Sequence, residues 1–228
     1  MLGKYREESP EATEIGRILS KLKAAREERN VKTVMITSST LAEGKSTTAA
    51  YLAIACSKYR NTRTLLIDLD LRRPKIHDLF GLKKKGGIGD ILSQKIPTNF
   101  CIKSTQYANL KIVTCGKLRD IPSRLLNSDF LKEMLAELRF YFDLVIIDTP
   151  PVIPVSDPLM LSSEIDGCLF VIKAGKTQKP VIQRAIKLLR DAKVEILGVI
   201  LNNVKHVLPY YYDYKFYRYE YYVENESS

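Results

Sequence analysis

The chain has 228 residues, of which 45% are hydrophobic, so it is long enough for one sizeable folded domain. Its formal net charge of +10 suits acidic partners, such as an anionic membrane face or a phosphorylated segment. No signal peptide opens the chain and no apolar run approaches the length of about twenty residues that spans a bilayer, so we expect a soluble, cytoplasmic protein.

The first predicted element is a helix over residues 10–29. Its apolar residues recur at helical spacing, and acidic residues occupy its first turn. The apolar stripe consists of Ile15, Ile18, Leu19 and Leu22. Such a helix can dock on its own domain or join copies of the chain, and the pattern alone favours neither.

A phosphate-binding loop is predicted next. A strand over residues 31–37 runs into Glu43-Gly44-Lys45-Ser46-Thr47, and a helix follows near residues 46–60. Backbone N–H groups of this loop and of the first helical turn would surround a phosphate, where the helix dipole favours negative charge. Lys45 would reach the β- and γ-phosphates, and the Ser46 hydroxyl would ligate Mg²⁺.

Two further strands end in carboxylates. The strand over 64–68 leads into Asp68 and Asp70, which are two residues apart and so project to the same side of an extended segment. The strand over 143–148 ends in Asp148 and is stopped by two prolines. A single strand-end Asp is usually a cap or turn former. Three strands that each end in suitable chemistry predict a Mg²⁺–nucleotide site.

The remaining pattern predicts an α/β fold, with a mostly parallel sheet covered by helices on both faces. Further strands are expected near 110–114, 166–173 and 195–201, and further helices near 128–141, 156–163 and 178–192. The stretch 81–109 is irregular and predicts surface loops with one short helix around 89–93. Asn202, at the end of the last strand, either contacts the nucleotide base or forms a turn. The four cysteines lack metal-like spacing, so we expect reduced thiols.

Tyrosines crowd the C-terminus. Eight of the thirteen tyrosines lie there, at Tyr210, Tyr211, Tyr212, Tyr214, Tyr217, Tyr219, Tyr221 and Tyr222. One interpretation is an edge strand, since apolar and polar residues partly alternate. We favour a flexible tail of phosphate acceptors, because a core would distribute its aromatic residues over several elements and because chain termini are generally mobile.

These motifs together resemble the bacterial tyrosine kinase (BY-kinase) family. Glu43–Thr48 resembles its Walker A motif, Leu66–Arg72 its additional Walker A′ motif, and Val145–Pro151 its Walker B motif, with Asp157 shortly after. The tyrosine cluster completes the resemblance, which covers nearly the whole chain. Where many members have glycine, this chain has Ala42, which should fit only if its φ angle stays negative.

The resemblance implies a P-loop kinase that uses ATP and Mg²⁺ to phosphorylate tyrosines, chiefly in trans on the tail of another copy, in capsule or exopolysaccharide assembly. It implies Lys45, Asp68, Asp70 and Asp148 as catalytic residues. It implies that residues 43–47 contact the nucleotide and that Ser46, Asp70 and Asp148 ligate Mg²⁺. Asn202 is added to the nucleotide contacts because of its position at a strand end. A separate membrane protein would recruit the kinase to the inner face of the plasma membrane and activate it.

A ring of subunits is also implied, through an N-terminal Glu-x-x-Arg-x-x-Arg motif. Here Glu11 and Arg17 match the motif, but Glu14 replaces its middle arginine. The corresponding division of the chain is an N-terminal helix at 1–30, a kinase domain at 31–206 and a tyrosine tail at 207–228.

Two other functions remain open from the sequence. A ParA/MinD-like ATPase would need a signature lysine early in the loop, where this chain has Thr40. A nucleotide-gated adaptor would need little catalysis. No aromatic–basic stacking motif is present in the body, so we expect no nucleic acid partner.

Overall fold

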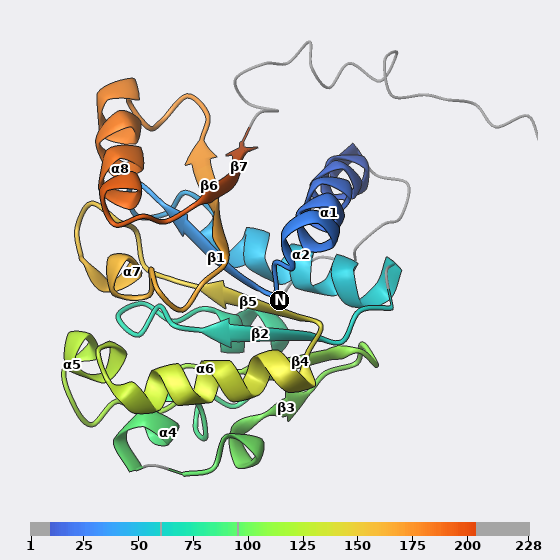
Figure 1. The fold of residues 1–228 in the computed structure, drawn as a ribbon, viewed down its shortest axis with the longest axis vertical. Coiled ribbons are helices and arrows are strands. Elements are labelled where there is room, and N and C mark those ends of the chain that lie inside the picture. Colours follow the sequence, from blue (N-terminus) through green and yellow to red (C-terminus); the bar gives the residue numbers. More distant parts are fainter. Residues whose placement is uncertain (1–9, 60, 95, 204–228) are drawn as a thin grey trace, which may run out of the picture.

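A seven-stranded sheet crosses the molecule, and helices cover both of its faces in the computed structural model, which describes residues 10–59, 61–94 and 96–203 (Figure 1). The strands are β1 Thr33–Ser38, β2 Thr64–Asp68, β3 Lys103–Ser104, β4 Leu110–Val113, β5 Leu144–Asp148, β6 Gly167–Lys173 and β7 Ile196–Asn202. The helices are α1 Pro10–Arg29, α2 Lys45–Tyr59, α3 Ile76–Phe80, α4 Ile88–Gln94, α5 Pro122–Leu126, α6 Asp129–Tyr141, α7 Asp157–Met160 and α8 Lys179–Asp191, with a 3-10 turn η1 at Thr98–Cys101.

The strand order is β3-β4-β2-β5-β1-β6-β7. All neighbouring pairs are parallel except β3 with β4. The prediction of a mostly parallel sheet is therefore confirmed. The three central strands β2, β5 and β1 are buried along their whole length, as expected for apolar runs covered on both sides.

Alternate residues of the strands pack into two separate hydrophobic cores, one on each face of the sheet. In β1, Val34 and Ile36 face the core under α1 and α2, whereas Met35 faces the core under α6 and α8. This division follows from the period of two along a strand. In α1, Leu19, Leu22 and Ala25 are buried in the first core, and the helix packs against α2 (Figure 1). The predicted helix thus docks on its own domain.

Some short elements differ from the sequence prediction. The helix expected over 156–163 ends at Met160. The stretch 81–109 contains η1 and β3 besides the predicted short helix, and α3 and α5 were not predicted. Each of these helices has only one turn, too short for a helical period to be read. Gly81 ends α3 with a φ of 64°, a left-handed conformation that glycine adopts without strain.

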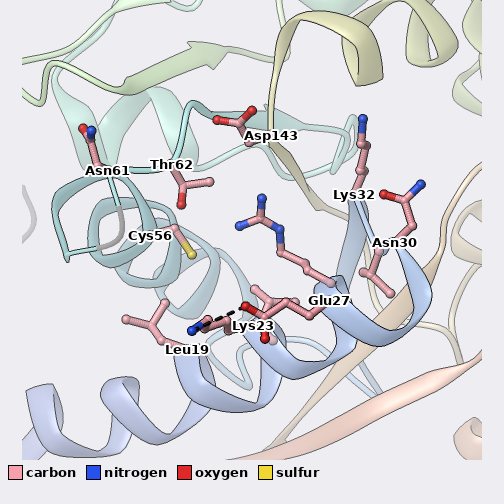
Figure 2. A pocket seen from close by; sticks show the side chains of 12 residues that line it. Leu19, Lys23, Glu27, Asn30, Lys32, Cys56, Asn61, Thr62 and Asp143 are labelled. Atoms are coloured by element: carbon pink, nitrogen blue, oxygen red, sulfur yellow. Dashed lines mark ion pairs between the residues drawn. The ribbon is translucent and has the colours of Figure 1, made fainter.

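The amino ends of the strands border a cavity of about 440 Å³. Figure 2 shows Leu19, Lys23 and Glu27 of α1 on one side and Asp143, just before β5, on the other. The dashed line marks the ion pair between Lys23 and Glu27. The cavity lies at the opposite end of the strands from the three motifs.

Within the described ranges, no helix is long and apolar enough to cross a membrane. The four cysteines are buried as free thiols. Burial raises the pKa of Cys115 and Cys168 to about 12, which keeps both thiols protonated. The predicted tyrosine cluster at 210–222 falls outside the described residues.

Candidate active site

Three adjacent strands bring the three motifs to one edge of the sheet. In the central order β2-β5-β1, each strand ends at the same edge because all three run parallel. The register places Asp68 of β2 beside Asp148 of β5, and Asp148 beside Ile36 of β1. The predicted convergence of these motifs is therefore present in the fold.

The phosphate loop, residues 39–44, connects β1 to α2. The helix begins at Lys45, and the Thr48 N–H donates to the carbonyl of Gly44 at 2.9 Å. Gly44 has a φ of 99°, and a Cβ built there would lie 2.0 Å from the side-chain nitrogen of Asn202. Glycine is required at this position for both reasons.

Glu43 fixes the loop from inside. Its carboxylate is buried and accepts hydrogen bonds of 2.6 Å from both the N–H and the hydroxyl of Thr40. Its second oxygen accepts from the Lys173 N–H of β6 at 3.3 Å, and its carbonyl accepts from the Asn202 amide at 2.9 Å. The sequence predicted only backbone contacts for Glu43. An acidic residue inside a phosphate-binding motif, where a free carboxylate would repel the ligand, was the available signal.

The φ angle of Ala42 differs from the one expected from the sequence. Its φ is 60°, in the left-handed region, and not negative as its fit was expected to require. A Cβ in this region approaches the following carbonyl oxygen and costs about 1–2 kcal/mol. The loop tolerates this strain because Glu43 and Gly44 are held on its C-terminal side by the contacts described above.

The three carboxylates differ in their surroundings. Asp70 lies almost fully buried beside a cavity, and one of its oxygens accepts from the Arg73 N–H at 2.9 Å. Asp68 is fully buried, and one oxygen accepts from the Ile76 N–H at 3.1 Å. The other oxygen of Asp68 and both oxygens of Asp148 have no hydrogen-bond partner within the described chain.

Burial dominates the electrostatics of these groups. It raises the pKa of Asp68 well above its ordinary value, and repulsion from Asp148 adds to this rise. Burial also raises the pKa of Asp148 to about 7. The nearby hydroxyl of Ser46 and the ammonium of Lys45 limit that rise in the pKa of Asp148. The Ser46 hydroxyl nevertheless makes no hydrogen bond of normal geometry with either Asp148 oxygen. Carboxylate oxygens that are buried and unpartnered beside a serine hydroxyl fit the oxygen ligands that Mg²⁺ prefers.

A cavity of about 300 Å³ opens over this edge. It is lined by Leu41, Ala42, Gly44, Lys45, Ser46, Thr47, Asp70, Arg73, Lys75 and Leu79. Glu43 and Asn202 support the loop from the side of β6 and β7, and Asp68 and Asp148 end the neighbouring strands. The larger cavity at the amino ends of the strands contains none of the motif residues, so we assign the candidate site to this smaller one.

The predicted oligomerisation residues lie elsewhere. Arg17 is on α1 and pairs with Glu14 one turn earlier, at 2.5 Å. Glu14 therefore engages the arginine that the family motif would use between subunits. The side chain of Glu11 is outside the described part of the chain.

The comparisons with known proteins agree with this geometry. A family model described as ParA, NUBPL iron-transfer P-loop NTPase, matches residues 30–216. The chain is 37% identical to the tyrosine-protein kinase YwqD of Bacillus subtilis over 82% of its own length and 79% of the relative. It superposes on the chimerical protein CapA2B2 with a TM-score of 0.81 and 30% identity, covering 86% of each chain.

The fold and the loop therefore define a P-loop NTPase, a class that binds nucleotides with Mg²⁺. Within that class, the chain belongs to the bacterial tyrosine-protein kinases and is a protein-tyrosine kinase. The cell-division ATPase MinD of Pyrococcus furiosus, with 24% identity, a TM-score of 0.62 and coverage of 75% of this chain and 71% of that one, shares the fold alone.

Proposed function

We propose that the chain uses ATP and Mg²⁺ to phosphorylate tyrosines, chiefly those at 210–222 in a neighbouring copy, in the control of capsule or exopolysaccharide assembly. The observation that carries this proposal is the position of buried, unpartnered carboxylate oxygens on β2 and β5 beside the phosphate loop. These carboxylates could receive a metal on one side and a phenol on the other.

Each residue has a proposed role. The amides of residues 43–47 hold the phosphates, and Lys45 stabilises charge that develops on the transferred group. Ser46, Asp70 and Asp148 would hold Mg²⁺, which when bound supplies neutralisation of the phosphate charge. Asn202 contributes to nucleotide binding because its side-chain amide donates a hydrogen bond to the Glu43 carbonyl in the phosphate loop.

The acceptor side needs a base. The phenol of tyrosine has a pKa of about 10, so its deprotonation at neutral pH requires assistance. We assign this role to the Walker A′ pair. Asp70 lines the cavity, whereas Asp68 is fully buried and tied to the N-terminus of α3. Because Asp70 is also a proposed Mg²⁺ ligand, it would place the metal at the cavity. Asp68, whose second oxygen has no hydrogen-bond partner within the described chain, would then take the phenol proton.

The division proposed for the chain is an N-terminal helix at 1–30, a kinase domain at 31–206 and a tyrosine tail at 207–228. In this scheme, a membrane protein recruits the kinase to the inner face of the plasma membrane and activates it through a cytoplasmic segment. Copies of the chain assemble, in part through Glu11 and Arg17. Each added phosphate brings about −1.5 to −2 charges. Heavily modified tails should therefore leave the acidic site and loosen the assembly.

The competing ATPase function has less support. At the place of the signature lysine, Thr40 donates two hydrogen bonds to Glu43 inside its own loop. It has no charge with which to neutralise a γ-phosphate across a dimer. A nucleotide-gated adaptor would leave the buried carboxylates of β2 and β5 without a catalytic role.

A mixture of two chains, one without activity and one without the C-terminal tyrosines, tests the proposal. A Lys45→Met chain with an intact C-terminus is incubated with ATP, Mg²⁺ and an active chain truncated after Leu208, and phosphotyrosine on the longer chain is measured. We expect transfer to the Lys45→Met chain. Its absence, with the intact enzyme labelling itself at a rate independent of concentration, would show transfer within one chain. The complete lack of phosphotyrosine in every mixture would contradict the kinase mechanism.

The activator is tested separately. We expect the isolated chain to be weakly active and to be stimulated by the cytoplasmic segment of its membrane partner. Equal turnover with and without that segment would contradict the proposed activation.

A further inference from the structure

A bidentate ion pair joins the Walker A′ loop to the segment that follows Walker B. The Nε and Nη2 atoms of Arg72 donate to the two oxygens of Asp157 at 2.9 and 3.1 Å. The side chain of Asp157 is 1% exposed and that of Arg72 is 41% exposed. Two parallel hydrogen bonds fix both distance and orientation, which a single contact cannot do.

The segment that carries Asp157 is itself attached to the phosphate loop. After β5, the N–H groups of Val152 and Ile153 donate to the carbonyls of Ser38 and Ser39, at 2.9 and 3.1 Å. The hydroxyl of Thr37 donates to the carbonyl of Pro150 at 2.8 Å. Residues 149–153 therefore follow the start of the phosphate loop before the chain reaches α7.

The loop that carries Arg72 holds the acceptor-side carboxylates. Asp70 accepts from the Arg73 N–H, and Asp68 accepts from the Ile76 N–H. Both bonds come from backbone within four residues of Arg72. A shift of this loop would therefore move the two carboxylates with it.

From this chain of contacts we propose that Arg72 and Asp157 are a positioning pair that sets the Walker A′ carboxylates at a fixed place relative to the phosphate loop. The pair acts through Asp70 and Asp68 and does not itself touch the nucleotide. This inference rests on the proposed roles of Asp68 and Asp70 in the reaction. It adds two residues to the acceptor side of the reaction and predicts that acceptor transfer and nucleotide binding respond differently when the pair is altered.

The same sheet offers a matched control. Arg63 and Asp143, at the amino ends of β2 and β5, form an equally bidentate pair with distances of 3.2 and 2.7 Å. Arg72→Lys and Arg63→Lys are therefore the same chemical change, made in the loop after β2 in one case and just before β2 in the other. Lysine keeps the charge and loses the planar fork. Asp157→Asn serves as a second variant on the active pair.

The experiment uses the full chain with a synthetic peptide of residues 207–228 as the acceptor. Initial rates give kcat for the peptide and KM for both peptide and ATP, and hydrogen exchange is followed in residues 69–76. For Arg72→Lys we expect kcat to fall about tenfold or more, because small displacements of reacting groups are costly, while KM for ATP stays within about twofold. Exchange of the Arg73 and Ile76 amides should accelerate, and Arg63→Lys should match the wild type in every quantity.

Three results would overturn the positioning role. These are wild-type kinetics and exchange in Arg72→Lys, an equal loss in Arg63→Lys, or a KM for ATP that rises in parallel with the loss of kcat. If the wild-type chain transfers no phosphate, the proposed function fails. The exchange data then decide alone, since acceleration confined to Arg72→Lys supports the pair and its absence refutes it.

Discussion

At the amino ends of β2 and β5, Asp143 accepts two hydrogen bonds from the guanidinium of Arg63 and one from its backbone N–H. At the carboxyl ends of the same strands, Asp68 and Asp148 are fully buried and keep oxygens without a partner. The pKa of Asp143 is accordingly lowered by Arg63, whereas burial raises the pKa values of Asp68 and Asp148.

The difference separates structural carboxylates from functional ones. A carboxylate that contributes to folding is paired within the protein, and the one at the amino end follows this rule. Buried oxygens without partners reduce the stability of the fold unless a ligand completes them. If this contrast reflects function, substitutions at the two ends should differ in their effects on activity and stability.

The largest effect is expected for Lys45→Met. Removing the charge that follows the transferred phosphate should cost about 3 kcal/mol or more of barrier, which is a loss of transfer of more than about a hundredfold. Phosphotyrosine formation measures it. Lys23→Met, on the wall of the amino-end cavity, is the matched control and should keep full activity. Equal losses in both variants would remove the distinction between the two ends.

Asp148→Asn should lose phosphate transfer and yet stabilise the ligand-free fold. Ionised Asp148 is destabilising at pH 8 because its folded pKa is raised to about 7 from an ordinary value of about 4. A neutral amide should therefore increase the free energy of unfolding by up to about 4 kcal/mol, less the cost of burying the amide itself. Urea unfolding measures the change. Asp143→Asn should shift stability slightly in the opposite direction, because the exposed Arg63 weakens its contribution. A stability loss in both variants would contradict the contrast.

The pH dependence of stability should also differ between the two ends. A carboxyl group with a raised folded pKa binds more protons in the folded state, so unfolding of the ligand-free chain should become harder as the pH falls from 8 to 6.5. Asp148 should contribute a gain of about 1 kcal/mol, which should disappear in Asp148→Asn, whereas any part due to the raised pKa of Asp68 should remain. Asp143, with its lowered pKa, contributes stability above the ordinary Asp range, which is lost only in more acidic solution. Asp143→Asn should therefore keep the dependence between pH 8 and 6.5.

Ala42→Gly is the smallest of these changes. Relief of the left-handed strain should raise the free energy of unfolding by about 1 kcal/mol, with little change in transfer. Ala24→Gly, on the exposed side of α1, is the same substitution in ordinary helical backbone and should lower stability by a similar amount. A loss of stability in Ala42→Gly would mean that residue 42 is not strained.

The positions of the motif residues could be predicted from the sequence better than the contacts that hold the phosphate loop in place. Each motif stands at the end of an apolar run, so Lys45, Asp68 and Asp148 could be placed at one edge of a parallel sheet from local pattern alone. The support of Glu43 by Lys173, and that of the loop by Asn202, joins residues more than a hundred positions apart, and no local period encodes such contacts. The φ of Ala42 was missed for the same reason. Its conformation is set by the residues around it, against its own preference.

The contact between Asn202 and the phosphate loop has a practical consequence for shortening the gene. Asn202 is the last residue of β7, and its amide both holds the carbonyl of Glu43 and occupies the space beside Gly44. Its side-chain oxygen in turn accepts from the Asn203 N–H at 2.8 Å. A stop codon placed after residue 203 should leave the loop intact, whereas one placed two codons earlier would remove part of the loop's support together with the tyrosines. Deletions of the C-terminus are therefore interpretable only when they spare residue 203.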